Sequence, residues 1–457
     1  MRQIAFTLVL CAAASAQIKL PAFNREVLPN GAVVYLMPKA GLPLVHFRIL
    51  VKGGGESEPA GLAGVASVTA ELLRRGTGQR TAEQFAQELD SLGGTFMASP
   101  DEQATMIGAE FLKKDFDEGL GLVADVLLHA NFPQEEVRKT LSRRADVLKS
   151  NKDNPQAAIN SYYRSFFFGK SHPYGNVTSE ASLDRIRRED IAAYYQRMYT
   201  GRNLVVIVTG DFDPAAAKTK IAAVFGAAPA GTAYTWQEDK PVVSTAPRLL
   251  LVDKPDATQT YFIISQPGVR RATPDRIALT VVNELFGGRF SSMLNEELRV
   301  NTGLTYGASS RVEMSRLTGG LAISTYTKTE TTGRAIDLAL EVLKRFHDNG
   351  ITAEQLASAK SYLKGNYPPQ HVETIDQLAT VLGEMELFGL GRDEVDQFFA
   401  RVDGVTLEQA NEAIRRHYGV TNLTFVLLGN ASKIREVAAK YAPQMAERSV
   451  KQPGWAE

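Results

Sequence analysis

The sequence predicts an α+β protein built from two domains of similar design, and three observations support this. The chain has 457 residues, which is more than one compact core usually holds. Strand-like and helix-like segments come in blocks without regular β-α alternation, which is typical of α+β domains. Elements of the first half also return, in the same order, in the second half. We therefore expect two homologous domains, each a mixed or mostly antiparallel sheet with helices mainly on one face, which form a clam-like pair around a cleft.

Apolar, β-branched segments open the first half and predict strands at 33–38 and 45–53. A helix is expected next, over 64–77, and a further strand around 105–111. The apolar residues of this helix recur at intervals of three and four and predict one buried stripe, made of Leu62, Val65, Ala66, Thr69, Leu72 and Leu73. The residues expected on the opposite face are Ser67, Ala70, Glu71 and Arg74.

An internal repeat relates the two halves. The segment 204–226 reads as an apolar strand, a Gly-polar turn and a short helix, and the same pattern returns at 423–443, about 220 residues later. That distance is a typical domain size. The second half also opens with strand-like segments, at 248–255 and 258–267, and a further strand is expected around 321–326.

The boundaries between these parts follow from composition. Residues 229–247 are rich in Pro, Gly, Ala and Thr and predict a linker between domains at 17–228 and 248–457. Residues 1–16 combine a basic start, a short apolar run and small residues at the end, which is the layout of a secretory signal peptide. We expect export to the periplasm or the extracellular space, with an uncleaved anchor as the alternative.

Charge and cysteine content exclude several classes of function. Lys and Arg number 51, as do Asp and Glu, so no basic surface for nucleic acid is expected. No membrane span is expected in the mature chain. Cys11 is the only cysteine and lies in the expected signal peptide. Disulfides, cysteine nucleophiles and thiolate metal sites are therefore not expected after cleavage.

Four segments together resemble the pitrilysin/insulinase-type zinc peptidases. The segment 58–77 resembles the helix that carries that family's inverted zinc motif, and 132–155 resembles the helix that brings its third ligand. The His-Pro-Tyr-Gly turn at 171–175 and the Gly-rich segment 287–307 are similar to further family segments. The resemblance covers nearly all of the mature chain and implies the family's short form, in which a subunit has two homologous α+β domains.

The family's metal motif, His-x-x-Glu-His, is not present in this chain. Aligned from the shared Gly-Thr end, the two histidine positions are Ser67 and Glu71, and the position of the catalytic glutamate is Ala70. The third ligand, a glutamate, would fall at Val147, with Asp146 beside it. A serine hydroxyl is a poor zinc ligand and an alanine accepts no proton. The resemblance therefore implies a degenerate zinc site, with no catalytic residue and no metal ligand in this chain.

Other interpretations of these positions stay open on the residues alone. Glu71 and Arg74 also fit a plain solvated helix face, and Glu71 with Asp146 could form a residual site for a hard cation. The six histidines include no pair at the helical spacing of metal ligands.

The second half retains an arginine and a tyrosine at the separation that the resemblance assigns to substrate contacts. These are Arg299 and Tyr306, and Gly303 between them is expected to end a helix in a left-handed conformation. An arginine in a last helical turn and a packed tyrosine are the plain alternative. The preceding Gly287 and Gly288 fit either a close backbone approach or a tight turn, and the turn is the favoured interpretation.

The resemblance implies a non-catalytic subunit of a heterodimeric zinc peptidase that acts on extended peptides and is inactive alone. The zinc and the catalytic base would belong to a partner chain, and Arg299 and Tyr306 would contact the substrate. Residues 95–111 predict a hairpin whose edge strand could pair with a peptide or be covered by the chain itself. The alternatives are a stand-alone peptide-binding or scaffolding protein and a metallopeptidase with a rearranged metal site.

Overall fold

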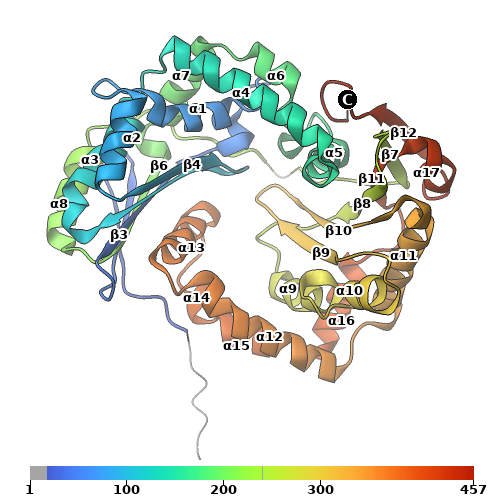
Figure 1. The fold of residues 1–457 in the computed structure, drawn as a ribbon. Helices are drawn as coiled ribbons and strands as arrows, with labels where there is room; N and C mark the ends of the chain where they lie inside the picture. The colour runs from blue at the N-terminus through green and yellow to red at the C-terminus, as the bar shows by residue number, and fades with distance from the viewer. Residues whose placement is uncertain (1–17, 239, 457) are drawn as a thin grey trace, which may run out of the picture.

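The computed structural model describes residues 18–238 and 240–456, which form two six-stranded sheets (Figure 1). The first sheet has the order β1-β2-β6-β3-β5-β4 and the second β12-β7-β11-β8-β10-β9. The strands of the first sheet are β1 Asn24–Val27, β2 Val33–Pro38, β3 Leu44–Lys52, β4 Thr95–Pro100, β5 Ala104–Leu112 and β6 Leu204–Gly210. Those of the second are β7 Arg248–Asp253, β8 Gln259–Pro267, β9 Ala308–Met314, β10 Gly319–Lys328, β11 Thr424–Gly429 and β12 Gln444–Ser449. The expected signal peptide, 1–16, lies outside the described residues.

The sheets confirm the predicted α+β class and match the internal repeat of the sequence. Strands β2, β6, β3, β5 and β4 correspond in order to β7, β11, β8, β10 and β9. In both sheets the first two of these strands are parallel and the rest pair antiparallel. The sixth strands differ, because β1 is antiparallel to β2 whereas β12 is parallel to β7.

Helices surround both sheets (Figure 1). Those before the coil that joins the halves are α1 Val65–Leu72, α2 Ala82–Ser91, α3 Phe116–Leu128, α4 Gln134–Asp153, α5 Pro155–Phe168, α6 Glu180–Arg185, α7 Arg188–Met198 and α8 Pro214–Phe225. Those after it are α9 Arg276–Asn283, α10 Met293–Asn295, α11 Thr332–Asn349, α12 Ala353–His371, α13 Ile375–Phe388, α14 Asp393–Asp396, α15 Phe398–Gly404, α16 Leu407–His417 and α17 Ala431–Ala438. Short 3-10 turns are η1 Gly54–Ser57, η2 Leu73–Arg75, η3 Lys113–Asp115, η4 Pro173–Gly175, η5 Gly201–Asn203 and η8 Thr329–Thr331, and π-helical segments are η6 Glu284–Gly288 and η7 Glu296–Asn301. None of the described helices is long and apolar enough to cross a membrane.

The two halves exchange one helix each. Helix α13 of the second half packs on β3 and β6 of the first sheet, and α5 of the first half packs on β8 and β11 of the second (Figure 1). Each sheet therefore has its own helices on one face and a helix of the other half on the opposite face. This explains why every residue of β6 and β11 is buried, since a strand is buried along its whole length only where both faces of the sheet are covered.

The core follows from this exchange. One apolar cluster combines Tyr35 and Ile207 of the first sheet with Leu378 and Leu382 of α13 and continues into the core of the second half. A second cluster fills the space between the first sheet and its own helices, and a third lies between α5 and the second sheet. The halves thus share a continuous hydrophobic core.

Polar contacts also join the halves. Arg164 of α5 pairs with Glu102, in the turn between β4 and β5, at 2.5 Å and with Glu313 of β9 at 3.2 Å. The coil between α8 and β7 is held from both sides as well. Its Gln237 donates a backbone hydrogen bond to buried Glu56 of η1 at 3.0 Å, and Arg316 of the second half donates to the Gln237 carbonyl at 2.5 Å.

Candidate functional site

Helix α1 carries the positions of the family's first two zinc ligands and presents only a narrow strip to solvent. Its partly accessible residues are Ser67 and Glu71, and the accessible strip continues into η2 with Arg74 and Arg75. Ala70, expected beside them, is instead fully buried. That expectation is wrong because α1 packs against β4, α4 and α7, so a simple two-faced pattern does not apply.

A half-buried carboxylate fixes the start of α1. Glu58 accepts hydrogen bonds from the backbone N–H groups of Gly64 and Ala66, at 2.9 Å each. Gly64 has a φ of 97°, and a Cβ there would lie 2.6 Å from Thr178 Cγ2, so glycine is required. Burial raises the pKa of Glu58 to about 7 against its two backbone donors. No pattern in the sequence distinguishes Glu58 from the solvated acids of the chain.

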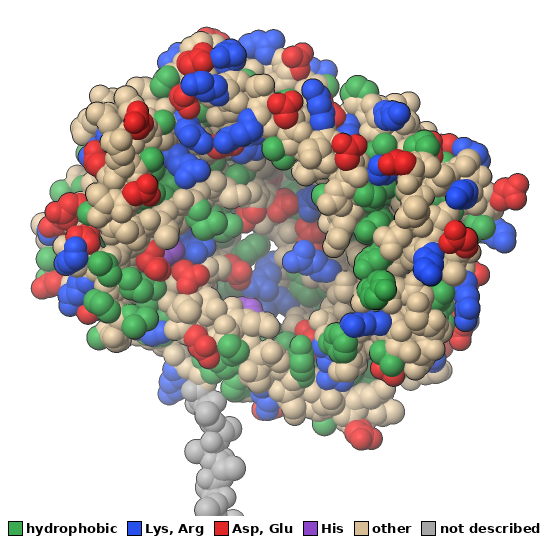
Figure 2. All heavy atoms as spheres, viewed as in Figure 1, with side chains coloured by type: hydrophobic (Ala, Val, Ile, Leu, Met, Phe, Trp, Pro, Cys, Tyr) green, Lys and Arg blue, Asp and Glu red, His purple; other side chains and the backbone are tan. Residues whose placement is uncertain are grey.

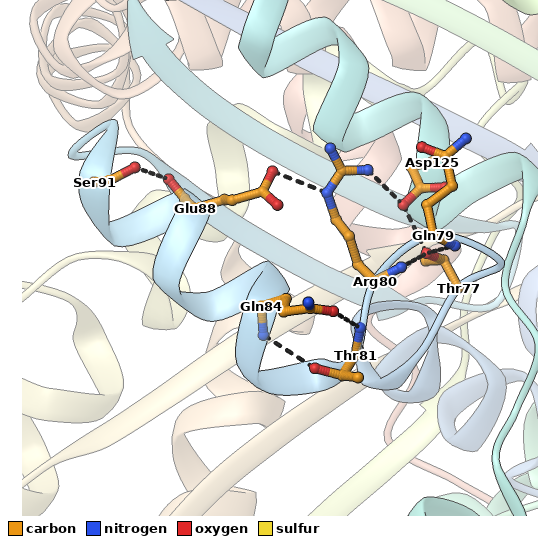
Figure 3. Close-up of polar contacts among 8 residues, drawn as sticks. All are labelled: Thr77, Gln79, Arg80, Thr81, Gln84, Glu88, Ser91 and Asp125. Atoms are coloured by element: carbon orange, nitrogen blue, oxygen red, sulfur yellow. Dashed lines mark hydrogen bonds and ion pairs between the residues drawn. The ribbon is translucent and has the colours of Figure 1, made fainter.

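The segment that follows α1 and η2 is fixed by a polar network, shown in Figure 3. The Thr77 hydroxyl donates to buried Asp125 of α3 at 2.7 Å, and Arg80 donates to the same carboxylate at 2.9 Å. Arg80 also reaches Glu88 of α2 at 2.9 Å. The Gly-Thr end from which the metal positions are aligned is therefore anchored to two neighbouring helices.

Two arginines of α4 occupy the surroundings of Glu71. Arg144 Nε donates to Glu71 Oε2 at 2.7 Å, its Nη2 donates to the Ser67 carbonyl at 2.9 Å, and Arg143 forms a second ion pair with Glu71. The Glu71 side chain is only 16% exposed. The interpretation of Glu71 as part of a solvated face is therefore wrong, because α4 covers it.

The position of the third ligand lies on the same face of α4. Val147 follows Arg143 and Arg144 by one helical turn and is 51% exposed. Asp146 is instead 72% exposed and pairs with Lys149 of its own helix at 3.9 Å. The structure thus brings together the helices that bear the expected zinc positions, but it does not bring Asp146 to Glu71.

These residues do not fit a zinc ion. Ser67 and Val147 offer no suitable ligand, and the one carboxylate, Glu71, is held by two guanidinium groups. Across residues 18–238 and 240–456, no three His, Cys, Asp or Glu side chains form a group that could hold a metal. A rearranged metal site therefore finds no ligand set in the described part of the chain.

The substrate residues expected in the second half lie at its surface. Arg299 is in η7, and its guanidinium stacks 4.6 Å from the ring centre of Phe290. Tyr306 is 79% exposed and Phe290 68% exposed. Gly303 donates to the Arg299 carbonyl with a φ of 65°, so the expected left-handed ending is confirmed.

Two features of this segment differ from the favoured interpretation of the sequence. Phe290 joins Arg299 and Tyr306 as an exposed aromatic, although only the Gly-rich sequence before it attracted notice. Gly287 lies in π-helical η6 and not in a tight turn, and a Cβ there would lie 2.3 Å from the Ser310 backbone nitrogen of β9. The glycine is required by this close approach.

The predicted hairpin is present, and β4 is the edge strand of the first sheet. Its residues alternate between exposed and half-buried, with Met97 exposed.

A separate cavity of about 780 Å³ lies between the halves and is lined by residues such as Arg48, Arg276 and Tyr367. Figure 2 shows this hollow with side chains of both charges in view. None of the expected site residues lines it.

Comparisons with known proteins agree with this architecture. Residues 35–172 match the family model described as Insulinase (Peptidase family M16), and residues 185–363 match the model described as Peptidase M16 inactive domain. An "Uncharacterized zinc protease" of Mycobacterium leprae is 26% identical over 411 residues, which is 87% of this chain and 91% of the relative. The "Non-peptidase homolog YmxG" of Helicobacter pylori is 24% identical over 395 residues, covering 86% and 90%.

Solved structures show the same fold. The crystal structure of a peptidase M16 inactive domain from Pseudomonas fluorescens aligns with a TM-score of 0.82 at 24% identity, covering 89% of this chain and 98% of that one. A protease from Helicobacter pylori aligns with a TM-score of 0.79 at 18% identity, covering 90% and 100%. With both halves matched by its domain models, the chain belongs to peptidase family M16, as a short two-domain member.

Proposed function

We propose that this chain is the non-catalytic subunit of a heterodimeric M16 zinc peptidase that acts on extended peptides. The observation that carries the proposal is a contrast between its two halves. In the first, the zinc positions hold Ser67, Ala70, Glu71 and Val147, and arginines bind the one remaining acid. In the second, Arg299 and Tyr306 stay at the surface.

This pair of surface residues can serve a site completed by another chain. The Arg299 guanidinium would donate to a peptide carbonyl or to a developing oxyanion, and the Tyr306 phenol would donate to the same group. Stacking on Phe290 restricts the arginine side chain before substrate arrives. The partner would carry the intact motif, the zinc and the catalytic glutamate.

Two further observations support the proposal of a non-catalytic subunit in an exported complex. The name of the Helicobacter relative describes a homologue without peptidase activity. The amino-terminal pattern at 1–16, which is typical of a secretory signal peptide, supports our proposal that the complex works in the periplasm or the extracellular space.

The test is to co-purify this chain with an M16 chain that carries His-x-x-Glu-His and to measure hydrolysis of a quenched fluorescent peptide. We expect hydrolysis by the complex and none by this chain alone. Arg299→Ala and Tyr306→Phe should each lower kcat/KM by about tenfold or more without dissociating the complex. Arg334→Ala, an exposed arginine on α11, is the matched control. Unchanged hydrolysis in the Arg299→Ala complex would refute the assigned role.

A further inference from the structure

The surroundings of the vacated zinc position are rich in arginine. Arg143 and Arg144 reach it from α4, and Arg74 and Arg75 extend from the end of α1 in η2. Arg74 and Arg75 follow Glu71 by three and four residues, which puts them on its side of the helix. Figure 2 shows Lys and Arg side chains gathered where α1 and α4 reach the surface.

Acidic residues do not balance this surface. Glu71 is shared by Arg143 and Arg144. Glu58 also attracts Arg144 electrostatically, but its carboxylate is hydrogen-bonded to the backbone N–H groups at the start of α1. Within the described part of the chain, Arg74 and Arg75 form no ion pair or hydrogen bond, and Arg75 Nε is buried without a partner. Four guanidinium groups against the carboxylates of Glu71 and Glu58 leave at least two positive charges in excess.

We propose that these four arginines form a carboxylate-binding site that recognises an acidic group of an extended peptide. A guanidinium group offers a planar pair of donors that matches a carboxylate. The position where the family binds a doubly charged cation therefore keeps its positive charge, now fixed on side chains. Such a site attracts and orients an anion but supplies no activated water.

The neighbouring elements favour a peptide as the source of the carboxylate. Helix α1 packs against β4, the edge strand whose N–H and C=O groups can pair with an added strand. A peptide along β4 could place an Asp or Glu side chain, or its own carboxyl end, against the arginines. The chain has no net charge, so the basic surface is local and does not resemble a nucleic-acid interface.

The site is independent of the proposed partner, because all its residues belong to this chain. Its test is therefore done on the purified chain alone, and its outcome is separable from that of the hydrolysis assay. The probe is a fluorescent extended decapeptide with two Asp residues and a free carboxyl end, measured by anisotropy at low salt. Versions with Asn in place of Asp, with an amidated end, and with both changes complete the set.

We expect the acidic peptide to bind at least about tenfold more tightly than the doubly neutralised one, and added salt to weaken this preference. Loss with Asn identifies a side chain as the ligand, and loss with amidation identifies the carboxyl end. Arg74→Ala with Arg75→Ala should remove the preference without leaving an acid unpaired, whereas Arg138→Ala, exposed on α4, should not. Glu71→Gln should strengthen binding, because it removes the competing carboxylate. Equal binding of the acidic and doubly neutralised peptides, or no effect of the Arg74 and Arg75 changes, would overturn the proposal.

Discussion

Arg144 connects the two positions that hold histidines in the family motif, because its guanidinium binds both the Glu71 carboxylate and the Ser67 carbonyl, at 2.7 and 2.9 Å. Burial and the neighbouring charge of Arg143 lower the pKa of Arg144, but an arginine stays charged in either case. The same contact holds α4 against α1. A side chain thus provides the link that a metal ion would provide between the two helices.

Restoring the motif alone is predicted not to restore the metal site. In the variant Ser67→His, Ala70→Glu, Glu71→His, Val147→Glu, the two arginines would remain beside the new ligands and repel a cation. We expect well below one equivalent of zinc per chain after dialysis, measured by atomic absorption.

Adding Arg143→Gln and Arg144→Gln to that variant should raise the zinc content towards about one equivalent. Circular dichroism of both variants checks that the fold is kept, since Glu at buried position 70 needs room. Full zinc occupancy with both arginines present would contradict the role assigned to them.

Phe290 offers a way to separate stability from function at the second site. Phe290→Ala removes an exposed stacking partner of Arg299, which is worth about 0.5–1 kcal/mol. We therefore expect a midpoint of urea unfolding close to that of the wild type, but slower hydrolysis by the complex. A large loss of stability with unchanged hydrolysis would show that the aromatic only packs.

Glu58 predicts a dependence of stability on pH. Its pKa in the folded chain, about 7, lies above its ordinary value of 4.5, so the folded state binds the proton more tightly. The contribution of this group to stability is therefore greatest below pH 4.5 and declines as the pH rises through 7. Glu58→Gln should unfold with about 2 kcal/mol more free energy than the wild type at pH 8, with the difference vanishing near pH 4.

A second glutamate serves as the control for Glu58. Glu83→Gln, exposed in the first turn of α2, should show no such pH-dependent difference. Urea unfolding at several pH values measures all three proteins. A constant difference between Glu58→Gln and the wild type would mean that Glu58 is ionised to the same extent in both states.

Arg164 is predicted to stabilise the contact between the two halves and so to raise the free energy of unfolding. Arg164→Ala leaves Glu102 and Glu313 without their shared cation, and such a loss at a half-buried pair costs about 2–4 kcal/mol. Arg138→Ala, which breaks only an exposed pair within α4, should cost less than about 0.5 kcal/mol. Chemical unfolding measures both, and equal losses would show that the contact between the halves adds nothing.

The sequence was most informative where a pattern repeats locally. Strand-like residue patterns and the internal repeat predicted β2, β3, β6 and β11, because the local sequence of such a strand is enough to indicate it. The strip Ser67, Glu71 and Arg74 also followed from helical spacing. The burial of Ala70 did not follow from helical spacing. It depends on the neighbouring elements, which here pack against α1 from several sides.

Long-range pairings were beyond such patterns. Arg143 and Arg144 lie more than 70 residues after Glu71, and nothing in their local sequence distinguishes them from the solvated arginines around them. The exchange of α5 and α13 was equally hidden. Its one trace in the sequence was the run of apolar residues in β6 and β11, which is interrupted only by Thr209 and Thr424 and by the final glycines.

The exchanged helices also determine where the protein can bend. A hinge in the coil at 227–247 would pull α13 off the first sheet and α5 off the second and expose apolar faces of both to water. A hinge motion that separates the two halves of this chain therefore costs free energy, because it exposes apolar surface, whatever the length of the linker. If peptides enter a site shared with another chain, access would depend on movement of the two subunits relative to each other. This subunit would then move as one rigid body.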